Sequence, residues 1–279
     1  MVLNPIIEKE LKTKMRGWKA PALLTGYLVF LGLVVFIYFK LNNSISYRYG
    51  MGYFNPRVAL DTYNVLAVFQ FILILLITPA LTGGSISGER ERQTLDLLLC
   101  TNISPFSIIT GKVVVSIAHV LLLVTASLPI LSIVFLFGGI SILDMILLFC
   151  FYLVTALMVA CIGIFYSTVF RKSVVSIIMT YITLGVLTIG TLVALAVWWE
   201  LIRGGGGSPG YVEGILFMFA NPLFGLGSVI GEQFFWSFST TTSRLAAYVK
   251  PWMVNVLFDL GAAAGLLVLS GMRLRMKKS

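Results

Sequence analysis

The chain has 279 residues, of which 58% are apolar or aromatic and 11% are charged. Soluble domains carry about 25% charged residues, so this composition excludes an ordinary water-soluble fold and predicts an all-α protein that crosses a membrane several times. Basic residues outnumber acidic ones, 20 to 11, but most of them flank apolar segments. That distribution is typical of membrane topology and argues against nucleic acid as a partner.

Residues 1–20 are predicted to form an amphipathic helix that lies flat on the membrane surface. Asn4 suits the N-cap and Pro5 the first helical position. One stripe of this helix is apolar and contains Leu3, Ile7, Leu11, Met15 and Trp18. Most of the remaining surface is basic and attracts acidic lipid. We expect Ile7, Leu11, Met15 and Trp18 to lie at the membrane interface; the alternative is a basic flank that only sets topology.

Six apolar segments are long enough to cross a bilayer, whose core needs about 20 helical residues. They are Pro21–Phe39, Tyr63–Thr82, Ile108–Phe137, Ile142–Phe170, Val174–Trp199 and Pro251–Gly271. The first is too long for a cleaved secretory signal, and no small-residue cleavage site follows it. Pro79 and Pro129 are predicted to kink their helices.

The distribution of Lys and Arg predicts how these six spans are oriented, because both residues favour the cytoplasmic side. Fourteen of the basic residues lie on the side that holds both termini and the loop of residues 83–107, and six lie on the other side. We therefore predict a multi-pass protein of the cytoplasmic membrane with both termini in the cytoplasm.

The cytoplasmic loop, residues 83–107, begins with the segment "GGSISGERERQTLDLLL". Its glycines are predicted to end the helix of the second span. A short amphipathic helix is then predicted from Glu89 onwards, ending before Ser104-Pro105, where Ser104 caps and Pro105 starts the third span. Local pairing of Glu89 with Arg92 would explain why the charges are tolerated. A helix that docks on a cytoplasmic partner explains both the charges and the leucines that follow.

The segment of residues 200–250 is predicted to be extracellular. Its apolar window, Gly214–Gly231, is interrupted by Asn221-Pro222, so we expect a re-entrant or interfacial hairpin of two short half-helices. A seventh span would place the basic C-terminus outside, against the distribution of charge. The run "RGGGGSPG", Arg203–Gly210, is a flexible tether.

Two ionisable residues lie within predicted spans, where a central Asp costs about 2.5–3.5 kcal/mol. Asp259 lies in the last span and His119, the single histidine, in the third. One hypothesis is a proton relay between them, and another is that Asp259 lines a transport pathway. The alternative is that each faces the bundle interior and bonds a hydroxyl group or water.

The segment "ISGERERQTLDLLLCTNISPFSIITGK" resembles the loop of ABC-2 type transporter permeases. In that family an E-R-E-x-x-T-L-[ED]-x-L-like segment is followed by a Ser-Pro helix start and Gly-Lys. The basic N-terminal arm, the six spans and the apolar hairpin before the last span extend the resemblance over nearly the whole chain. Gln93 departs from the pattern, because many relatives have Gly or Lys there.

The resemblance implies a coupling helix that inserts into a groove on a separate cytoplasmic ATPase, an N-terminal elbow helix and a lid at the outer mouth. It implies that the ATPase-docking residues are Glu89, Arg90, Glu91, Arg92, Leu95 and Asp96. It also implies a second permease half, in a homodimer or a heterodimer. The expected function is the ATP-driven export of an amphipathic or hydrophobic substrate.

The chain lacks the motifs of an ATPase or an intramembrane enzyme. No G-x-x-x-x-G-K-[ST] motif occurs, since Gly111-Lys112 is followed by Val113, so ATP and Mg²⁺ are expected on the partner ATPase. No HExxH, paired catalytic aspartates or Cys/His cluster with metal-ligand spacing is present, so we expect no catalytic residue and no metal site. The alternative to a permease is a six-span scaffold that recruits a cytoplasmic partner without transport.

Overall fold

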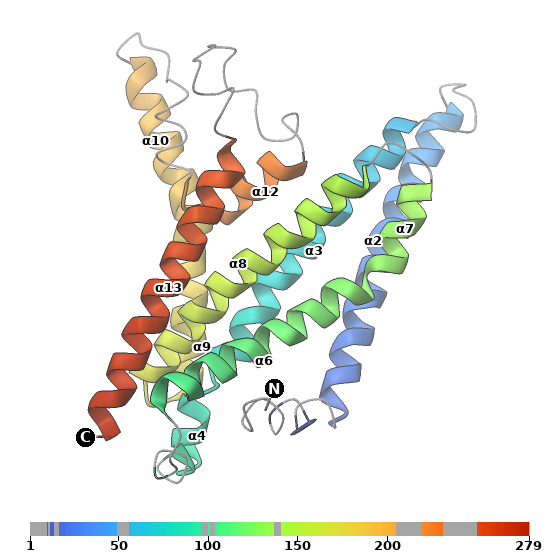
Figure 1. Ribbon diagram of the computed structural model, residues 1–279. Helices are drawn as coiled ribbons and strands as arrows, with labels where there is room; N and C mark the ends of the chain where they lie inside the picture. The colour runs from blue at the N-terminus through green and yellow to red at the C-terminus, as the bar shows by residue number, and fades with distance from the viewer. Residues whose placement is uncertain are drawn as a thin grey trace.

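The computed structural model describes most of the chain as helix (Figure 1). The described residues are 10, 12–13, 17–48, 56–95, 100, 104–136, 141–204, 219–230 and 250–278. The elements are α2 (Lys19–Arg48), α3 (Pro56–Thr82), α4 (Ser87–Glu91), α6 (Pro105–Ala126), α7 (Leu128–Leu136), α8 (Ile142–Val169), α9 (Ser173–Gly185), the π-helical turn η1 (Val186–Gly190), α10 (Thr191–Gly204), α12 (Pro222–Ile230) and α13 (Pro251–Lys278). Within these residues no β-strand occurs.

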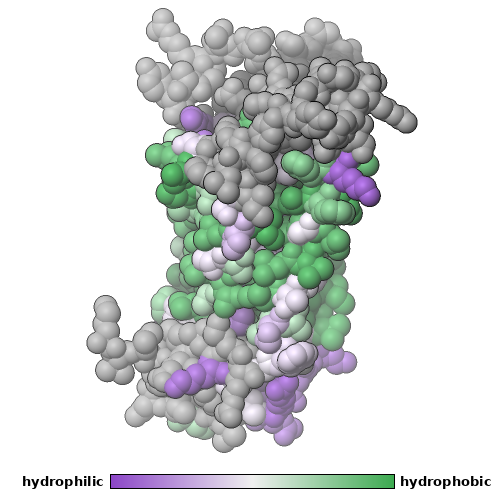
Figure 2. Space-filling model, turned by 90° about the vertical axis from the view of Figure 1, so that its right-hand side faces the viewer, coloured by the Kyte–Doolittle hydropathy of each residue, from purple (hydrophilic) through white to green (hydrophobic). Residues whose placement is uncertain are grey.

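Among the residues that the structure describes, six segments are long and apolar enough to cross a membrane, which confirms the six predicted spans. They are Ala20–Leu41, Leu60–Glu91, Pro105–Ser132, Ile142–Val169, Ser173–Leu201 and Pro251–Arg275. On the face seen in Figure 2, hydrophobic residues form a broad central band, and hydrophilic residues lie towards both ends of the molecule. This is the surface that a protein within a bilayer presents to lipid.

The third and fifth spans are interrupted helices. In the third span, a turn at Ser127 separates α6 from α7, next to the predicted kink at Pro129. Pro79 instead lies within α3, which continues to Thr82. In the fifth span, η1 separates α9 from α10.

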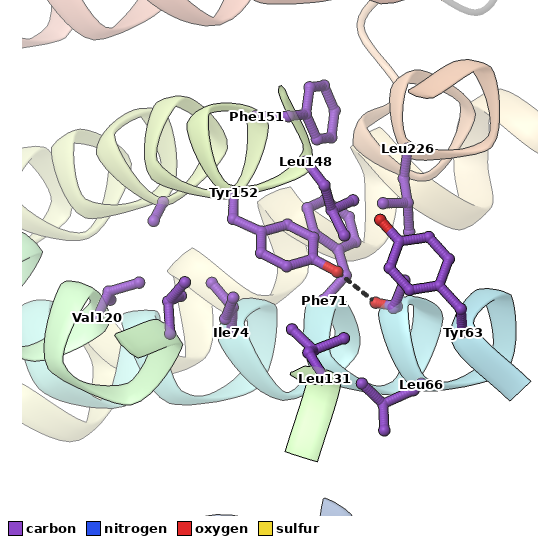
Figure 3. Close-up of a cluster of buried hydrophobic side chains, with 13 residues drawn as sticks. Tyr63, Leu66, Phe71, Ile74, Val120, Leu131, Leu148, Phe151, Tyr152 and Leu226 are labelled. Atoms are coloured by element: carbon purple, nitrogen blue, oxygen red, sulfur yellow. Dashed lines mark hydrogen bonds between the residues drawn. The ribbon is translucent and has the colours of Figure 1, made fainter. Parts of the chain in front are cut away.

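Helix α8 lies at the centre of the bundle and packs against α3, α6, α9, α12 and α13. The rings of Phe71 on α3 and Tyr152 on α8 stack with their centroids 5.6 Å apart (Figure 3). The hydroxyl of Tyr152 is buried and donates a hydrogen bond of 2.8 Å to the carbonyl oxygen of Ala67. The bilayer offers no water to such a group, so this bond both satisfies it and ties α8 to α3.

The predicted interruption at Asn221-Pro222 is observed as the start of a helix. Asn221 precedes α12, and its side-chain oxygen accepts a hydrogen bond of 2.9 Å from the backbone N–H of Leu223. Pro222 takes the first helical position, where it lacks only an N–H that would be unpaired. The preceding half-helix of the predicted hairpin lies largely outside the described residues.

Candidate functional site

The polar segment that follows the second span folds into a turn and a short helix at one end of the bundle (Figure 1). Helix α3 ends at Thr82, and four turn residues separate it from α4, which confirms that the glycine-containing segment interrupts the helix. We call this end of the molecule, where α4 and the C-terminus of α13 lie, the α4 end.

Helix α4 is shorter than the sequence predicts and begins earlier. The predicted continuous helix from Glu89 through the leucines is wrong, because α4 runs only from Ser87 to Glu91. Gln93 has a positive φ of 57°. The N–H of Thr94 donates to the carbonyl oxygen of Glu89 (2.9 Å), and that of Gln93 donates to Arg90 (3.1 Å). This pair of bonds is a Schellman C-cap, in which glycine is the usual residue at the position of Gln93.

The first residues of α4 are bound by a side chain of α8. The backbone N–H groups of Ile86 and Ser87 both donate to the hydroxyl oxygen of Ser167, each at 2.8 Å. Ser167 is fully buried. Because the first N–H groups of a helix have no partner within it, this single hydroxyl group fixes the start of α4 against α8.

Two charged side chains of α4 bind the junction between α8 and α9. The Arg90 guanidinium donates to the carbonyl oxygens of Phe170 (3.1 Å) and Thr168 (3.2 Å), at the C-terminus of α8. The Glu91 carboxylate accepts bonds from the backbone N–H (2.9 Å) and the hydroxyl (2.6 Å) of Ser173, at the start of α9. A cation at a helix C-terminus and an anion at an N-terminus both match the helix dipole, so both contacts are favourable.

The third charged residue of α4, Glu89, forms an ion pair with Lys112 of α6. The Lys112 ammonium lies 2.8 Å from Oε1 of Glu89 and 2.7 Å from Oε1 of Glu10. Only 3% of the Lys112 side chain is exposed. Oε2 of Glu89 is buried and has no hydrogen-bond partner among the described residues. One buried cation therefore joins the N-terminal segment, α4 and the third span.

Two glycines bring α3, α8 and α9 close together directly beside α4. A Cβ atom on Gly163 of α8 would collide with Oγ1 of Thr82 and would lie 3.3 Å from the backbone nitrogen of Gly83. A Cβ atom on Gly83 would lie 3.0 Å from the Cα of Ile177 on α9. Glycine is needed at both positions, because a side chain at Gly163 would collide with the side chain of Thr82 and one at Gly83 would collide with the backbone of Ile177.

The predicted docking residues differ in what they contact. Leu95 is buried in a cluster with Ile86, Ile109, Ile164 and Leu274, among others. Glu89 and Arg90 are half-buried, and their side chains bind other elements of the chain. Residues 91–94 are exposed, so a partner can reach them, while Asp96 lies outside the described residues. We call these four residues the α4 tip.

The remaining predicted site residues are placed separately. Trp18 is 87% exposed, whereas Ile7, Leu11 and Met15 lie outside the described residues. Nδ1 of His119 lies 2.9 Å from the carbonyl oxygen of Val115 in its own helix. Asp259 is fully buried, and its Oδ2 accepts a bond of 3.1 Å from the hydroxyl of Thr155 on α8. The structure therefore gives the two proposed relay residues different partners.

Sequence reasoning missed Lys112, Ser167 and Ser173, although each binds the α4 segment. Lys112 carried the clearest signal, because it is a lone charged residue near the start of an apolar span. Ser167 and Ser173 gave none, since small hydroxyl residues are common in membrane helices. In the described ranges, no group of three or more His, Cys, Asp or Glu side chains could hold a metal ion.

A family model described as "ABC-2 family transporter protein" matches residues 37–202. The match covers more than half of the chain and includes α4, the α8–α9 junction and Lys112, but not Glu10, α12 or α13. A search of curated proteins gives no match.

Proposed function

Because the chain belongs to the ABC-2 family of transporter proteins, it is a membrane-embedded permease subunit that associates with an ABC ATPase, and we propose that it exports its substrate outwards with energy from ATP hydrolysis. ATP and Mg²⁺ bind to the separate ATPase chain in this proposal. Both termini and the α4 end face the cytoplasm, and a second permease half, identical or related, completes the transporter.

The observation that supports this proposal is how firmly the charged residues of α4 bind the bundle. Glu89 binds the third span, and Arg90 and Glu91 bind the junction of the fourth and fifth. A force applied to α4 would pass to these helices, while the α4 tip leaves Arg92 exposed to a partner. ATP binding that draws two ATPase subunits together would then move the spans as rigid bodies.

Charge reversal at the α4 tip tests this docking. Arg92→Glu is expected to weaken co-purification of the ATPase and coupled ATP hydrolysis by about tenfold or more, because a reversed charge at an interface is repelled. The unfolding temperature should stay unchanged, since Arg92 is exposed. Glu91→Arg should weaken ATPase binding and also lower the unfolding temperature, because Glu91 binds Ser173 within the chain.

Arg275→Glu is the matched control, because Arg275 is an exposed basic residue on α13 at the α4 end. If the ATPase binds Arg92→Glu as well as the unchanged chain, the docking assignment is wrong. A different outcome is that the ATPase binds the unchanged chain and hydrolyses ATP, but vesicles that contain both proteins transport no substrate from a panel of amphipathic compounds. In that case the scaffold alternative replaces the permease.

Asp259 is proposed to line the transport pathway or to exchange a proton there. It is buried between α13 and α8, and its Oδ1 has no hydrogen-bond partner among the described residues. A carboxyl group in this setting is costly, and carboxyl groups within membrane spans typically mark substrate or ion pathways. Asp259→Asn keeps the shape and the bond from Thr155 but cannot titrate. We expect it to reduce transport and to abolish its dependence on pH; unchanged transport at every pH would remove Asp259 from the mechanism.

A further inference from the structure

The fifth span contains an irregular turn near its middle. Residues Val186–Gly190 form the π-helical turn η1, which separates α9 from α10. The hydroxyl of Thr188 donates to the carbonyl oxygen of Leu184 (2.8 Å), and that of Thr191 donates to Leu187 (2.7 Å). Such π turns weaken the regular hydrogen-bond ladder and recur at functional sites and kinks. The fifth span is therefore easiest to bend at η1.

The two halves of the fifth span differ in how they pack. The half near α4, α9, contacts α8, α3, α4 and η1. Among the described elements, η1 is the one that α10 contacts extensively. In Figure 1, α10 lies at the end of the bundle opposite α4. A bend at η1 would thus move α10 while α9 stays with the bundle.

One buried side chain joins α12 to this turn. Nδ2 of Asn221 donates to the carbonyl oxygen of Thr188 in η1 (3.0 Å) and to the hydroxyl of Thr191, the first residue of α10 (2.8 Å). Asn221 is fully buried. Its bonds are made at η1, where the backbone hydrogen bonds of the fifth span are irregular. They therefore hold the two halves of the span in one relative orientation.

Helix α12 is itself fixed to α13 and α8. Nδ2 of Asn255 on α13 donates to the carbonyl oxygens of Phe219 (2.8 Å) and Asn221 (3.1 Å). A Cβ atom on Gly225 of α12 would lie 2.5 Å from Oδ1 of Asn255 and 2.7 Å from the ring of Phe151 on α8. This close packing makes α12, α13 and α8 one body, and Asn221 connects that body to α10.

We infer that η1 is a hinge in the fifth span and that Asn221 is the latch that fixes the start of α10 to the start of α12. The structure represents the latched state, in which the Asn221 bonds fix η1 and the first residue of α10 to the start of α12. Release of the Asn221 bonds allows α10 to swing about η1. The assignment of this swing to substrate release rests on the proposed function, whereas the swing itself does not.

Distances between spin labels on α10 and α13 test the latch in the full-length chain. Val197 and Leu257 are exposed on these helices and are replaced by labelled cysteines, after Cys100, Cys150 and Cys161 have been replaced by Ser or Ala. The protein is placed in nanodiscs and diluted with unlabelled chain, so that each distance arises within one molecule. We expect one narrow distance population for this parent and a second, longer one for Asn221→Ser, which retains a helix-capping oxygen.

Thr180→Ala is the control for the loss of a buried polar group, because among the described residues the hydroxyl of Thr180 donates to the carbonyl oxygen of Ser176 in its own helix and to no other element. Its distances should equal those of the parent. An unchanged distribution in Asn221→Ser, or the same second population in Thr180→Ala, would overturn the latch. Neither measurement requires an ATPase or a substrate, so a failure here is distinct from a failure of the proposed function.

Stiffening of η1 tests the hinge separately. Alanine fits at Gly185, where a Cβ atom meets nothing within 4 Å, and at Gly190, where the nearest atom is 3.5 Å away. Because alanine favours a regular helix, Gly185→Ala with Gly190→Ala should suppress the second population in the Asn221→Ser background. Gly261→Ala on α13, which also meets no atom within 4 Å, should not suppress it. A second population that persists in the stiffened variant would overturn the position of the hinge.

Discussion

Replacing Lys112 with methionine is expected to lower the unfolding temperature by roughly 6–12 °C, the largest effect of any single charge change in this chain. Methionine keeps an unbranched chain of similar length in the same space but removes the ammonium group. The carboxylates of Glu10 and Glu89, which now flank that group at 2.7 and 2.8 Å, would then face each other without a cation. Breaking a buried ion pair costs about 3–5 kcal/mol.

Two comparisons separate this electrostatic cause from a loss of packing. Lys112→Arg retains the charge and should restore part of the stability, limited by the larger guanidinium group. Adding Glu10→Gln and Glu89→Gln to Lys112→Met removes the uncompensated charges and should raise the unfolding temperature again. Lys172→Met is the control, because Lys172 is exposed. The unfolding temperature of each of these four variants is measured in detergent. Equal unfolding temperatures for Lys112→Met and the unchanged chain would contradict the role of the ion pair.

The same variants report on energy coupling in the complete transporter. Lys112 lies on α6 and binds both the N-terminal segment, through Glu10, and α4, through Glu89. Its loss would therefore let α4 move independently of α6 and the N-terminal segment. We expect Lys112→Met to reduce the substrate transported per ATP hydrolysed more than it reduces ATPase binding. Arg92→Glu at the α4 tip should show the opposite pattern, since it affects binding first.

The spans were predictable from the sequence because their signal is local. A membrane helix needs about 20 apolar residues in a row, and each of the six segments can be identified without its neighbours. The start of α12 was predictable for the same reason, since Asn221-Pro222 is a local signal. Local signals also located the polar segment between the second and third spans.

The contacts of that segment were not predictable, because they join residues far apart in the chain. Lys112 and Glu10 are 102 residues apart, and Arg90 and Phe170 are 80 apart. The sequence suggested a local pair between Glu89 and Arg92, yet Glu89 binds Lys112 instead. The early end of α4 depends on the positive φ of Gln93, which glutamine rarely adopts. Docking on an ATPase and the orientation of the termini stay predictions.

Gly163→Val is expected to be the most damaging change at an apolar position. The new Cβ atom alone would collide with Oγ1 of Thr82 and would lie 3.0 Å from its Cβ. Thr82 is fully buried and its hydroxyl donates to the carbonyl oxygen of Thr78 at 2.8 Å, so turning its side chain away would break this bond. Overpacking of this kind costs typically 1–3 kcal/mol and occasionally more, and valine adds two further methyl groups.

A double-mutant cycle identifies the contact that causes the loss. Gly163→Ala should destabilise the chain less than valine does, and combining it with Thr82→Ala should cost less than the two single changes together, because the hydroxyl that clashes is absent. Additive losses would contradict the contact. Gly261→Val is the matched control, since a Cβ atom at that position on α13 meets nothing within 4 Å.

Gly163 also controls where α4 lies relative to the spans. Ser167, one turn further along α8, binds the start of α4, and the carbonyl groups of Thr168 and Phe170 bind Arg90. Because α4 follows α3 in the chain, separation of α3 from α8 at Gly163 would pull α4 away from these partners at the end of α8. We expect Gly163→Val to lose coupled ATP hydrolysis even in the fraction that stays folded, whereas Gly261→Val keeps it. Normal coupling in folded Gly163→Val would show that the crossing of α3 and α8 supports stability alone and that force reaches the spans through the Lys112 ion pairs.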